Sequence, residues 1–142
     1  MSKAHWPLVA LLKSPDKKLT PVQIQKTIFL FAQNIPDTIG HDAYKFKPYN
    51  YGPFDPAIYR DLEGAIEAGH VEPLPTSRGW DEYRITALGE RIAQETLADV
   101  SPDAEQYISR ITNWVRTTSF RELLTAIYKA YPAYAKRSVF NH

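Results

Sequence analysis

The sequence contains no cysteine, and it has no long apolar run. Without cysteine there is no disulfide, no thiol nucleophile and no cysteine-rich zinc site, which is typical of a cytoplasmic protein. A membrane-spanning helix needs a run of about 18 or more apolar residues. The first residues also lack the cleavage pattern of a signal peptide. We therefore predict a cytoplasmic protein with no membrane partner.

The chain also lacks the motifs of common catalytic and metal sites. Its histidines have no metal-ligand spacing, and there is neither a glycine-rich phosphate loop nor a G-x-S-x-G nucleophile motif. The histidines are His5, His41, His70 and His142. We therefore predict a protein that is not an enzyme, with no cofactor, no metal and no catalytic residue.

An excess of positive charge is missing as well. Lys and Arg number 17 against 16 Asp and Glu, a net charge of +1. Residues 1–100 carry 11 basic and 13 acidic side chains, whereas residues 101–142 carry 6 and 3. A DNA-reading protein usually has a basic face. These totals argue against DNA binding, although the folded surface can still segregate charge.

What is present is ample material for one core, since 44% of residues are hydrophobic and 13% aromatic. Helix-start signals, proline breaks and apolar spacing divide the first part of the chain. They predict a helix over Pro7–Lys13, a helix from Thr20-Pro21 to Asn34, a loop over Ile35–His41 and an extended segment over Tyr44–Tyr49.

The middle of the chain has a more specific pattern. Asp55-Pro56 begins a helix that Gly69 ends in a left-handed cap, and two short strands follow, Val71–Leu74 and Tyr83–Ile85. Pro73 and Pro75 cannot donate ladder hydrogen bonds, so the hairpin is expected at a sheet edge. Thr86 then caps a helix with Leu88, Ile92 and Leu97 inward.

Two further helices are predicted after residue 100. Ser101-Pro102 begins the first, and a capping box of Ser119 and Glu122 begins the second. The predicted inward residues are Tyr107, Ile108, Ile111, Trp114 and Val115, then Phe120, Leu123, Leu124, Ile127, Tyr128 and Tyr131.

A helix, a hairpin and another helix in succession are typical of a winged helix. We predict a mainly α fold with a small β-hairpin: a winged helix-turn-helix-like core over residues 1–100 and a C-terminal helical extension over 101–142, together one domain.

Several segments resemble a known family. They are YKFKPYNYGPF, the helix with Tyr59-Arg60-Asp61-Leu62, and Tyr83-Arg84-Ile85-Thr86-Ala87-Leu88-Gly89. This stretch, roughly Thr20 to Ala93, resembles the Panacea-type antitoxin domain and related small bacterial proteins. The resemblance implies a prokaryotic or phage origin and either toxin neutralisation or transcriptional control, not catalysis.

Candidate contact residues lie at the predicted wing tip and in the turn before the central helix. Arg78 can grip a phosphate and Thr76 and Ser77 can donate to one, or the segment is merely a solvated hairpin end. Tyr49 and Tyr51 either present hydroxyls to a partner or roof the core. The remaining candidates are Lys45, Lys47 and Arg60. Arg60 can reach a guanine edge, but Asp61, Glu63 and Glu67 share its helix and favour a scaffold role.

These observations lead to two functional hypotheses. The favoured one is a winged-helix transcriptional regulator that binds double-stranded DNA. The alternative is a protein-binding module, such as an antitoxin or phage accessory protein that acts on a partner such as a toxin. The aromatic residues of the C-terminal part, Trp114, Phe120, Tyr128, Tyr131 and Tyr134, also predict a homodimer that would bury them.

Overall fold

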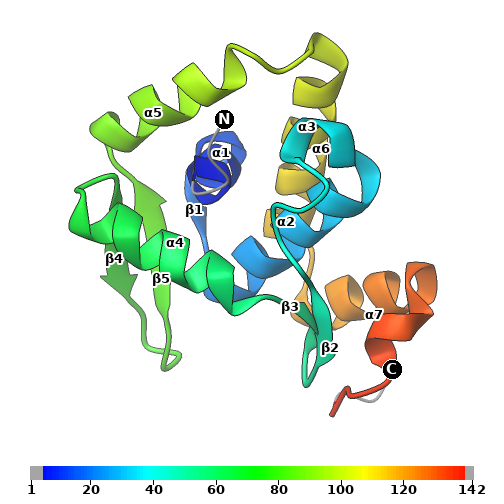
Figure 1. Ribbon diagram of the computed structural model, residues 1–142. Helices are drawn as coiled ribbons and strands as arrows, with labels where there is room; N and C mark the ends of the chain where they lie inside the picture. Colours follow the sequence, from blue (N-terminus) through cyan, green and yellow to red (C-terminus); the bar gives the residue numbers. More distant parts are fainter. Residues whose placement is uncertain (1–4, 140–142) are drawn as a thin grey trace.

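The computed structural model describes residues 5–139 and is mainly helical, with two small antiparallel sheets (Figure 1). Its elements are α1 (Trp6–Lys13), β1 (Lys18–Leu19), α2 (Pro21–Asn34), α3 (Pro36–Ile39), β2 (Lys47–Tyr49), β3 (Gly52–Phe54), α4 (Pro56–Glu67), β4 (Val71–Pro75), β5 (Asp81–Ile85), α5 (Ala87–Leu97), α6 (Pro102–Thr117), α7 (Phe120–Ala130) and a 3-10 turn, η2 (Pro132–Ala135).

The short helix α1 occupies the middle of the molecule, with α2, α4, α5 and α6 around it (Figure 1). Residues Trp6 to Leu11 are all buried. A helix that is apolar on every side is stable only when neighbours cover all of it. The sequence WPLVALL therefore forms the centre of the main core.

One sheet has the strand order β1–β5–β4, with both neighbouring pairs antiparallel. Val71 lies opposite Ile85, and β4, which contains Pro73 and Pro75, is an edge strand. The edge position of the hairpin is confirmed. The third strand, β1, was not predicted, because two residues are too few for an alternating pattern.

The second sheet is a small hairpin of β2 and β3, with Tyr49 opposite Gly52. The sequence predicted only an extended segment here. Gly52 adopts φ of +94°, and a Cβ at this position would lie 3.2 Å from Leu124 and 3.3 Å from Lys26. Only glycine fits this turn without strain, because it combines a left-handed backbone with close packing against two side chains.

The predicted helix starts are confirmed in detail. Thr20 and Gln23 form a reciprocal capping box at the start of α2, and the later helices have side-chain caps too. These caps are Asp55, Thr86, Ser101 and Ser119. Each side chain accepts a hydrogen bond from a backbone N–H of the first helical turn, as expected of these residue types.

Four details of the prediction are wrong. The segment Ile35–His41 contains the short helix α3, which packs beside α2. Leu88, Trp114 and Phe120 were placed inward but are 41%, 36% and 41% exposed. Each lies near the edge of its helix's apolar stripe, where spacing alone does not fix which side the neighbours cover.

Helix α2 is buried around its whole circumference from Ile24 to Phe31. Two of its polar side chains there, Gln25 and Lys26, have partners on the segment before α4, whereas the buried Thr27 hydroxyl has no hydrogen-bond partner in the described residues. The Gln25 side chain donates to the Asp55 carbonyl (2.9 Å) and accepts from the Asp55 N–H (3.1 Å). Lys26 Nζ donates to the Pro53 carbonyl (3.1 Å). The strand β3 therefore covers the polar side of α2.

The C-terminal helices add a second apolar cluster. Phe29 and Leu30 of α2 pack against Val115 of α6 and a row of α7 side chains. That row is Leu123, Leu124, Ile127 and Tyr128. Residues after 100 thus pack directly on α2. Within residues 5–139, no helix is long and apolar enough to cross a membrane.

Candidate functional site

A groove of about 620 Å³ lies between the β4–β5 hairpin tip, the β2–β3 turn and the first turns of α2 and α7. These four segments are far apart in the sequence, so the groove exists only in the folded chain. It is lined by Thr20, Pro21, Val22, Gln23, Tyr51, Arg78, Trp80, Thr118, Ser119, Phe120 and Leu123. We call it the aromatic groove.

Three aromatic side chains form its walls. Tyr51 is 49% exposed and Trp80 is 48% exposed. The Tyr51 and Phe120 rings meet edge to face, with centroids 5.7 Å apart. Large aromatic surfaces are normally buried in a folded chain. Three of them around one groove leave apolar area in contact with water.

The hairpin tip is held in shape by Thr76. Its hydroxyl donates to the Trp80 carbonyl and accepts from the Arg78 N–H (3.2 Å). This position of Arg78 agrees with the sequence prediction, since the residue is exposed at the tip of the hairpin. In the described part of the chain, the Arg78 guanidinium has no hydrogen-bond or ion-pair partner. It is thus available to a ligand, whereas Thr76 has a structural role.

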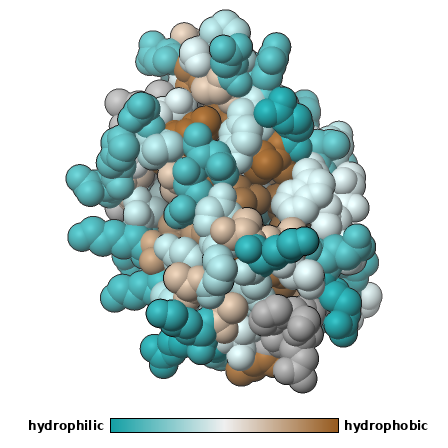
Figure 2. All heavy atoms as spheres, turned by 90° about the vertical axis from the view of Figure 1, so that its right-hand side faces the viewer, coloured by the Kyte–Doolittle hydropathy of each residue, from teal (hydrophilic) through white to brown (hydrophobic). Residues whose placement is uncertain are grey.

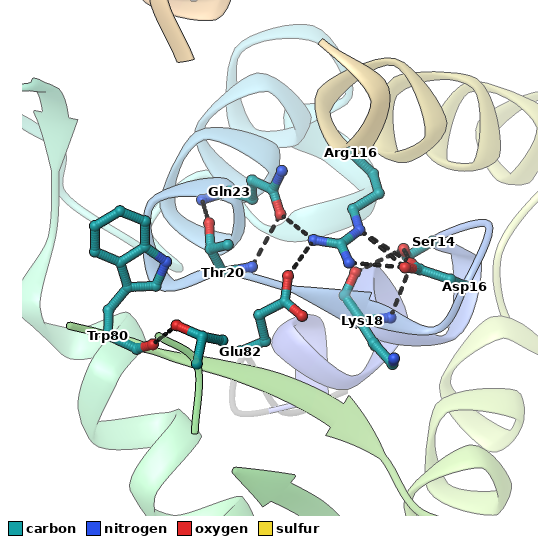
Figure 3. Close-up of polar contacts among 9 residues, drawn as sticks. Ser14, Asp16, Lys18, Thr20, Gln23, Trp80, Glu82 and Arg116 are labelled. Carbon is teal, nitrogen blue, oxygen red and sulfur yellow. Dashed lines mark hydrogen bonds and ion pairs between the residues drawn. The ribbon is translucent and has the colours of Figure 1, made fainter. Parts of the chain in front are cut away.

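Arg116 of α6 holds strand β5 at its end next to the hairpin turn (Figure 3). Its guanidinium donates three bonds to the Asp16 carboxylate, the shortest at 2.7 Å to Oδ2, and one to Glu82 Oε2 at 2.9 Å. It also donates to Gln23 Oε1 at 3.0 Å. One side chain therefore joins α6, the turn before β1, the start of α2 and β5.

The ion pairs shift the pKa values of this cluster. Burial alone would raise the pKa of Asp16, but hydrogen bonds from Arg116 and Ser14 and the charge of Arg116 outweigh it, so the pKa of Asp16 is lowered. Burial likewise opposes the charged form of Arg116, yet its bonds to Asp16 and Glu82 raise its pKa. Both residues stay charged at neutral pH.

Lys26 lies behind the Tyr51–Gly52 turn. Its side chain is almost fully buried, and burial lowers its pKa to about 7. The Pro53 carbonyl is its hydrogen-bond acceptor, and its Cε lies so near Gly52 that a Cβ there would come within 3.3 Å of it. Helix α2 is thereby tied to the turn that positions Tyr51.

The structure brings together only part of the predicted site. Tyr51 and Arg78 line the aromatic groove, and Ser77 is exposed beside Arg78. Tyr49 instead stacks on Phe54, with ring centroids 5.1 Å apart. Lys45 and Lys47 are exposed before and in β2, and neither lines the groove.

Arg60 is separate from all of these, on the exposed face of α4. Ala57 of the same helix is buried. Asp61 accepts a hydrogen bond from the Tyr44 hydroxyl (2.7 Å). Arg60 therefore shares the solvent face with Glu63 and Glu67, and that surface is acidic overall.

Sequence analysis did not predict two aromatic residues of the groove. Trp80 was not among the candidate contact residues, and Phe120 was placed in the core. A usable signal was present, since a large aromatic residue stands directly after the Arg-Gly turn and another at the first position of α7. First-turn positions lie at the end of a helix, where the neighbouring element can leave them uncovered.

The aromatic residues that predicted a dimer are largely engaged within the chain. Tyr131 and Tyr134 pack edge to face on Phe29, and Tyr128 is buried and donates to Ser138. Trp114 remains partly exposed beside a recess between α6 and α7. Figure 2 shows the face that lies on the right-hand side of Figure 1, where hydrophobic residues are visible between hydrophilic ones.

No cluster of three or more metal-ligating side chains occurs in residues 5–139. No protein-family model matches the chain, and no curated protein matches it either. The antitoxin resemblance therefore stays a prediction.

Proposed function

We propose that this chain is a non-enzymatic binding module that takes up a segment of a partner protein, such as a toxin, in the aromatic groove. The observation that carries the proposal is the convergence of Tyr51, Trp80, Phe120 and Arg78 on one hollow of about 620 Å³. Tryptophan, tyrosine and arginine are the residues most enriched among those that dominate protein interfaces.

An apolar side chain would occupy the aromatic groove more favourably than water does. Tyr51 and Trp80 are half-exposed, and the neighbouring walls are formed by Pro21, Val22 and Leu123. Burying apolar area releases about 25 cal/mol per Å². Contiguous exposed apolar surface on a protein commonly marks an interaction site.

The architecture supporting this groove is, in our proposal, a winged helix with an insertion. A helix, a short strand, a second helix, a third helix and a hairpin follow one another as α1, β1, α2, α4 and β4–β5. The order β1–β5–β4 agrees with such an arrangement. Residues 35–55 would then be the insertion, which supplies Tyr51. A prokaryotic or phage origin and a cytoplasmic location remain predictions.

Site-specific photo-crosslinking in the native cell tests the proposal. A benzophenone amino acid in place of Trp80 should form a covalent adduct with a partner protein, detected by mass spectrometry. The same amino acid in place of Leu88 is the matched control, because Leu88 is similarly exposed but lies on α5, outside the groove. Adducts that are absent at position 80, or equal at both positions, would rule the groove out as the partner site.

DNA binding is the second candidate, and the exposed Arg78 at the hairpin tip favours it. A wing arginine can contact a phosphate or enter the minor groove. The acidic face of α4 opposes it, because carboxylates next to phosphates are repelled.

A mobility-shift titration with the DNA upstream of the chain's own gene separates the two candidates. Binding through several phosphates should weaken steeply between low and moderate salt, and Arg78→Ala and Lys45→Ala should each weaken it further. No shift at low salt, together with adducts at position 80, would leave only the protein-binding function.

A further inference from the structure

We propose that the partner segment held in the aromatic groove is acidic, with a carboxylate next to a large apolar side chain. The inference rests on the proposed function and names the chemistry of the ligand. Arg78 would pair with the carboxylate, while the apolar side chain would lie among Tyr51, Trp80 and Phe120.

The charges around the groove point to a negative ligand. Of the described residues that line it, Arg78 alone is charged, and no carboxylate is among them. Three carboxylates lie within two residues of the lining in the sequence, those of Asp81, Glu82 and Glu122. Glu82 pairs with Arg116 at 2.9 Å, and Glu122 accepts from the Ser119 hydroxyl at 2.9 Å. Within residues 5–139, none of the three forms an ion pair with the Arg78 guanidinium.

The backbone adds to this preference. The first turns of α2 and α7 both border the groove, and Thr20, Ser119 and their neighbours are among its lining. A helix N-terminus carries a partial positive charge. A carboxylate near Arg78 would thus meet one full positive charge and two favourable dipoles, whereas a lysine there would be repelled.

A peptide fits these features better than a nucleic acid. A nucleic-acid surface needs several cations along the phosphate track. The groove has one, surrounded by apolar walls, and the neighbouring Trp80 offers area for a single side chain. One charge beside an apolar pocket is the pattern of a specific protein contact, where a buried anchor provides affinity and a charge fixes orientation.

Selection of random dodecapeptides displayed on phage, with the full chain as the target, tests the inference. The selected peptides should be enriched in Asp or Glu next to Leu, Phe or Trp. With Arg78→Glu as the target, the acidic residues should disappear and basic residues should replace them. Arg91→Glu is the control, because it makes the same change of charge on α5, outside the groove.

The affinity of the best selected peptide gives a second readout. Replacing its carboxylates by amides should weaken binding about tenfold, the effect expected for one charged hydrogen bond. Trp80→Ala should weaken binding of both peptide forms. Arg78 has no side-chain partner in residues 5–139, so Arg78→Glu should fold normally, which circular dichroism will check.

The possible outcomes distinguish a failure of the acidic-ligand inference from a failure of the proposed protein-binding function. Peptides that need Trp80 but show no preference for acid would overturn the inference and leave the protein-binding function intact. Failure to select any peptide overturns it as well. A DNA duplex that displaces the selected peptide in an Arg78-dependent manner would overturn it in favour of a nucleic-acid ligand. Acidic peptides without adducts at position 80 in cells would instead count against the proposed function.

Discussion

Lys26 is the residue whose chemistry departs furthest from its ordinary state. It is only 3% exposed, and burial lowers its pKa to about 7 from a usual value of 10.5. In the unfolded chain the amine binds a proton up to about pH 10, while in the folded chain it loses this proton near pH 7. Folding must therefore release the proton or bury the charge, and both cost free energy.

These two pKa values determine the direction in which the free energy of unfolding changes with pH. Between pH 7 and 10 the unfolded state holds more protons than the folded state, so the free energy of unfolding rises with pH. For the Lys26 pKa values, the rise from pH 7 to pH 9 is about 2 kcal/mol. We expect Lys26→Met to lack this rise. Urea unfolding of both chains at pH 7, 8 and 9 measures it.

The quantity to compare is the difference in the free energy of unfolding between the unaltered chain and Lys26→Met. Groups that titrate in both chains contribute equally to the two values and cancel in the difference. Measurements stop at pH 9, since Tyr59, whose pKa burial raises to about 12, would act in the opposite direction at higher pH. The variant also leaves the Pro53 carbonyl without its donor, which changes its stability at every pH alike. If the free energy of unfolding changed with pH equally in the two chains, the pKa of Lys26 would not be lowered in the folded state.

Gly89 and Gly64 form a matched pair of helical glycines in opposite surroundings. A Cβ on Gly89 would lie 2.2 Å from the His70 carbonyl oxygen and 2.8 Å from Ile85, whereas a Cβ on Gly64 would meet nothing within 4 Å. Alanine favours a helix over glycine by about 0.5–1 kcal/mol. Where the space is filled, overpacking costs about 1–3 kcal/mol or more.

We therefore expect Gly64→Ala to raise the free energy of unfolding and Gly89→Ala to lower it, as measured by urea denaturation. The backbone of His70 cannot move without disturbing β4, so the Cβ clash persists and Gly89→Ala lowers the free energy of unfolding. An equal effect of the two substitutions would mean that α5 does not approach the hairpin as closely as described.

At the scale of elements, the Arg116 cluster is what holds the hairpin against the helices. The side chain of Arg116 joins Asp16 and Glu82, and it lies partly buried between them. Breaking such a pair leaves carboxylates without their cation, which costs more than losing an exposed pair. The cluster also fixes β5 close to the start of α2, so it sets the width of the aromatic groove.

We expect Arg116→Met to destabilise the chain by about 1–3 kcal/mol and to speed hydrogen exchange in β4 and β5. Lys17→Met is the control, since Lys17 pairs with Glu90 at the surface, where such pairs contribute little. Unchanged exchange in the hairpin of Arg116→Met would show that the cluster does not hold it in place.

The elements divide into those that local sequence determines and those that tertiary contacts determine. The starts of α2, α4 and α7 were predictable, because Thr20, Asp55 and Ser119 cap their own first turns. So was the edge position of β4, which follows from its prolines. In contrast, β1 exists only because β5 pairs with it, and two residues carry no periodicity.

The candidate site was predictable only in part, for the same reason. Arg78 and Tyr51 stand in turns that the sequence marks clearly, and both line the groove. The Phe120 wall depends on where α7 docks, which no local pattern contains. The connection of Arg116 to Asp16 spans 100 residues and is likewise a property of the assembled chain.

At the scale of the whole molecule, the groove requires both residues 35–55 and the C-terminal helices. Tyr51 comes from residues 35–55, Trp80 from the hairpin, and Phe120 from α7. Leu124 of α7 packs against the Gly52 turn that positions Tyr51. Residues after 100 thus line the aromatic groove as well as the core. If the groove binds peptides as proposed, a chain truncated before α6 should lose peptide binding.

The homodimer remains a prediction. The packing of the aromatic residues indicates which surface of the chain could form the dimer contact. Tyr128, Tyr131 and Tyr134 are engaged within the chain, and Phe120 lines the aromatic groove. This leaves Trp114 beside the recess of about 370 Å³ between α6 and α7. Two copies related by a twofold axis would place this recess opposite itself and bury both Trp114 rings.

We therefore expect light scattering at tens of micromolar to give twice the monomer mass, and Trp114→Glu to give the monomer mass with unchanged circular dichroism. Burying a carboxylate in an apolar contact would oppose association strongly. Leu88→Glu, on similarly exposed surface of α5, should leave the dimer intact. A monomer mass for the unaltered chain would contradict the dimer, and equal effects of the two substitutions would place the contact somewhere other than between α6 and α7.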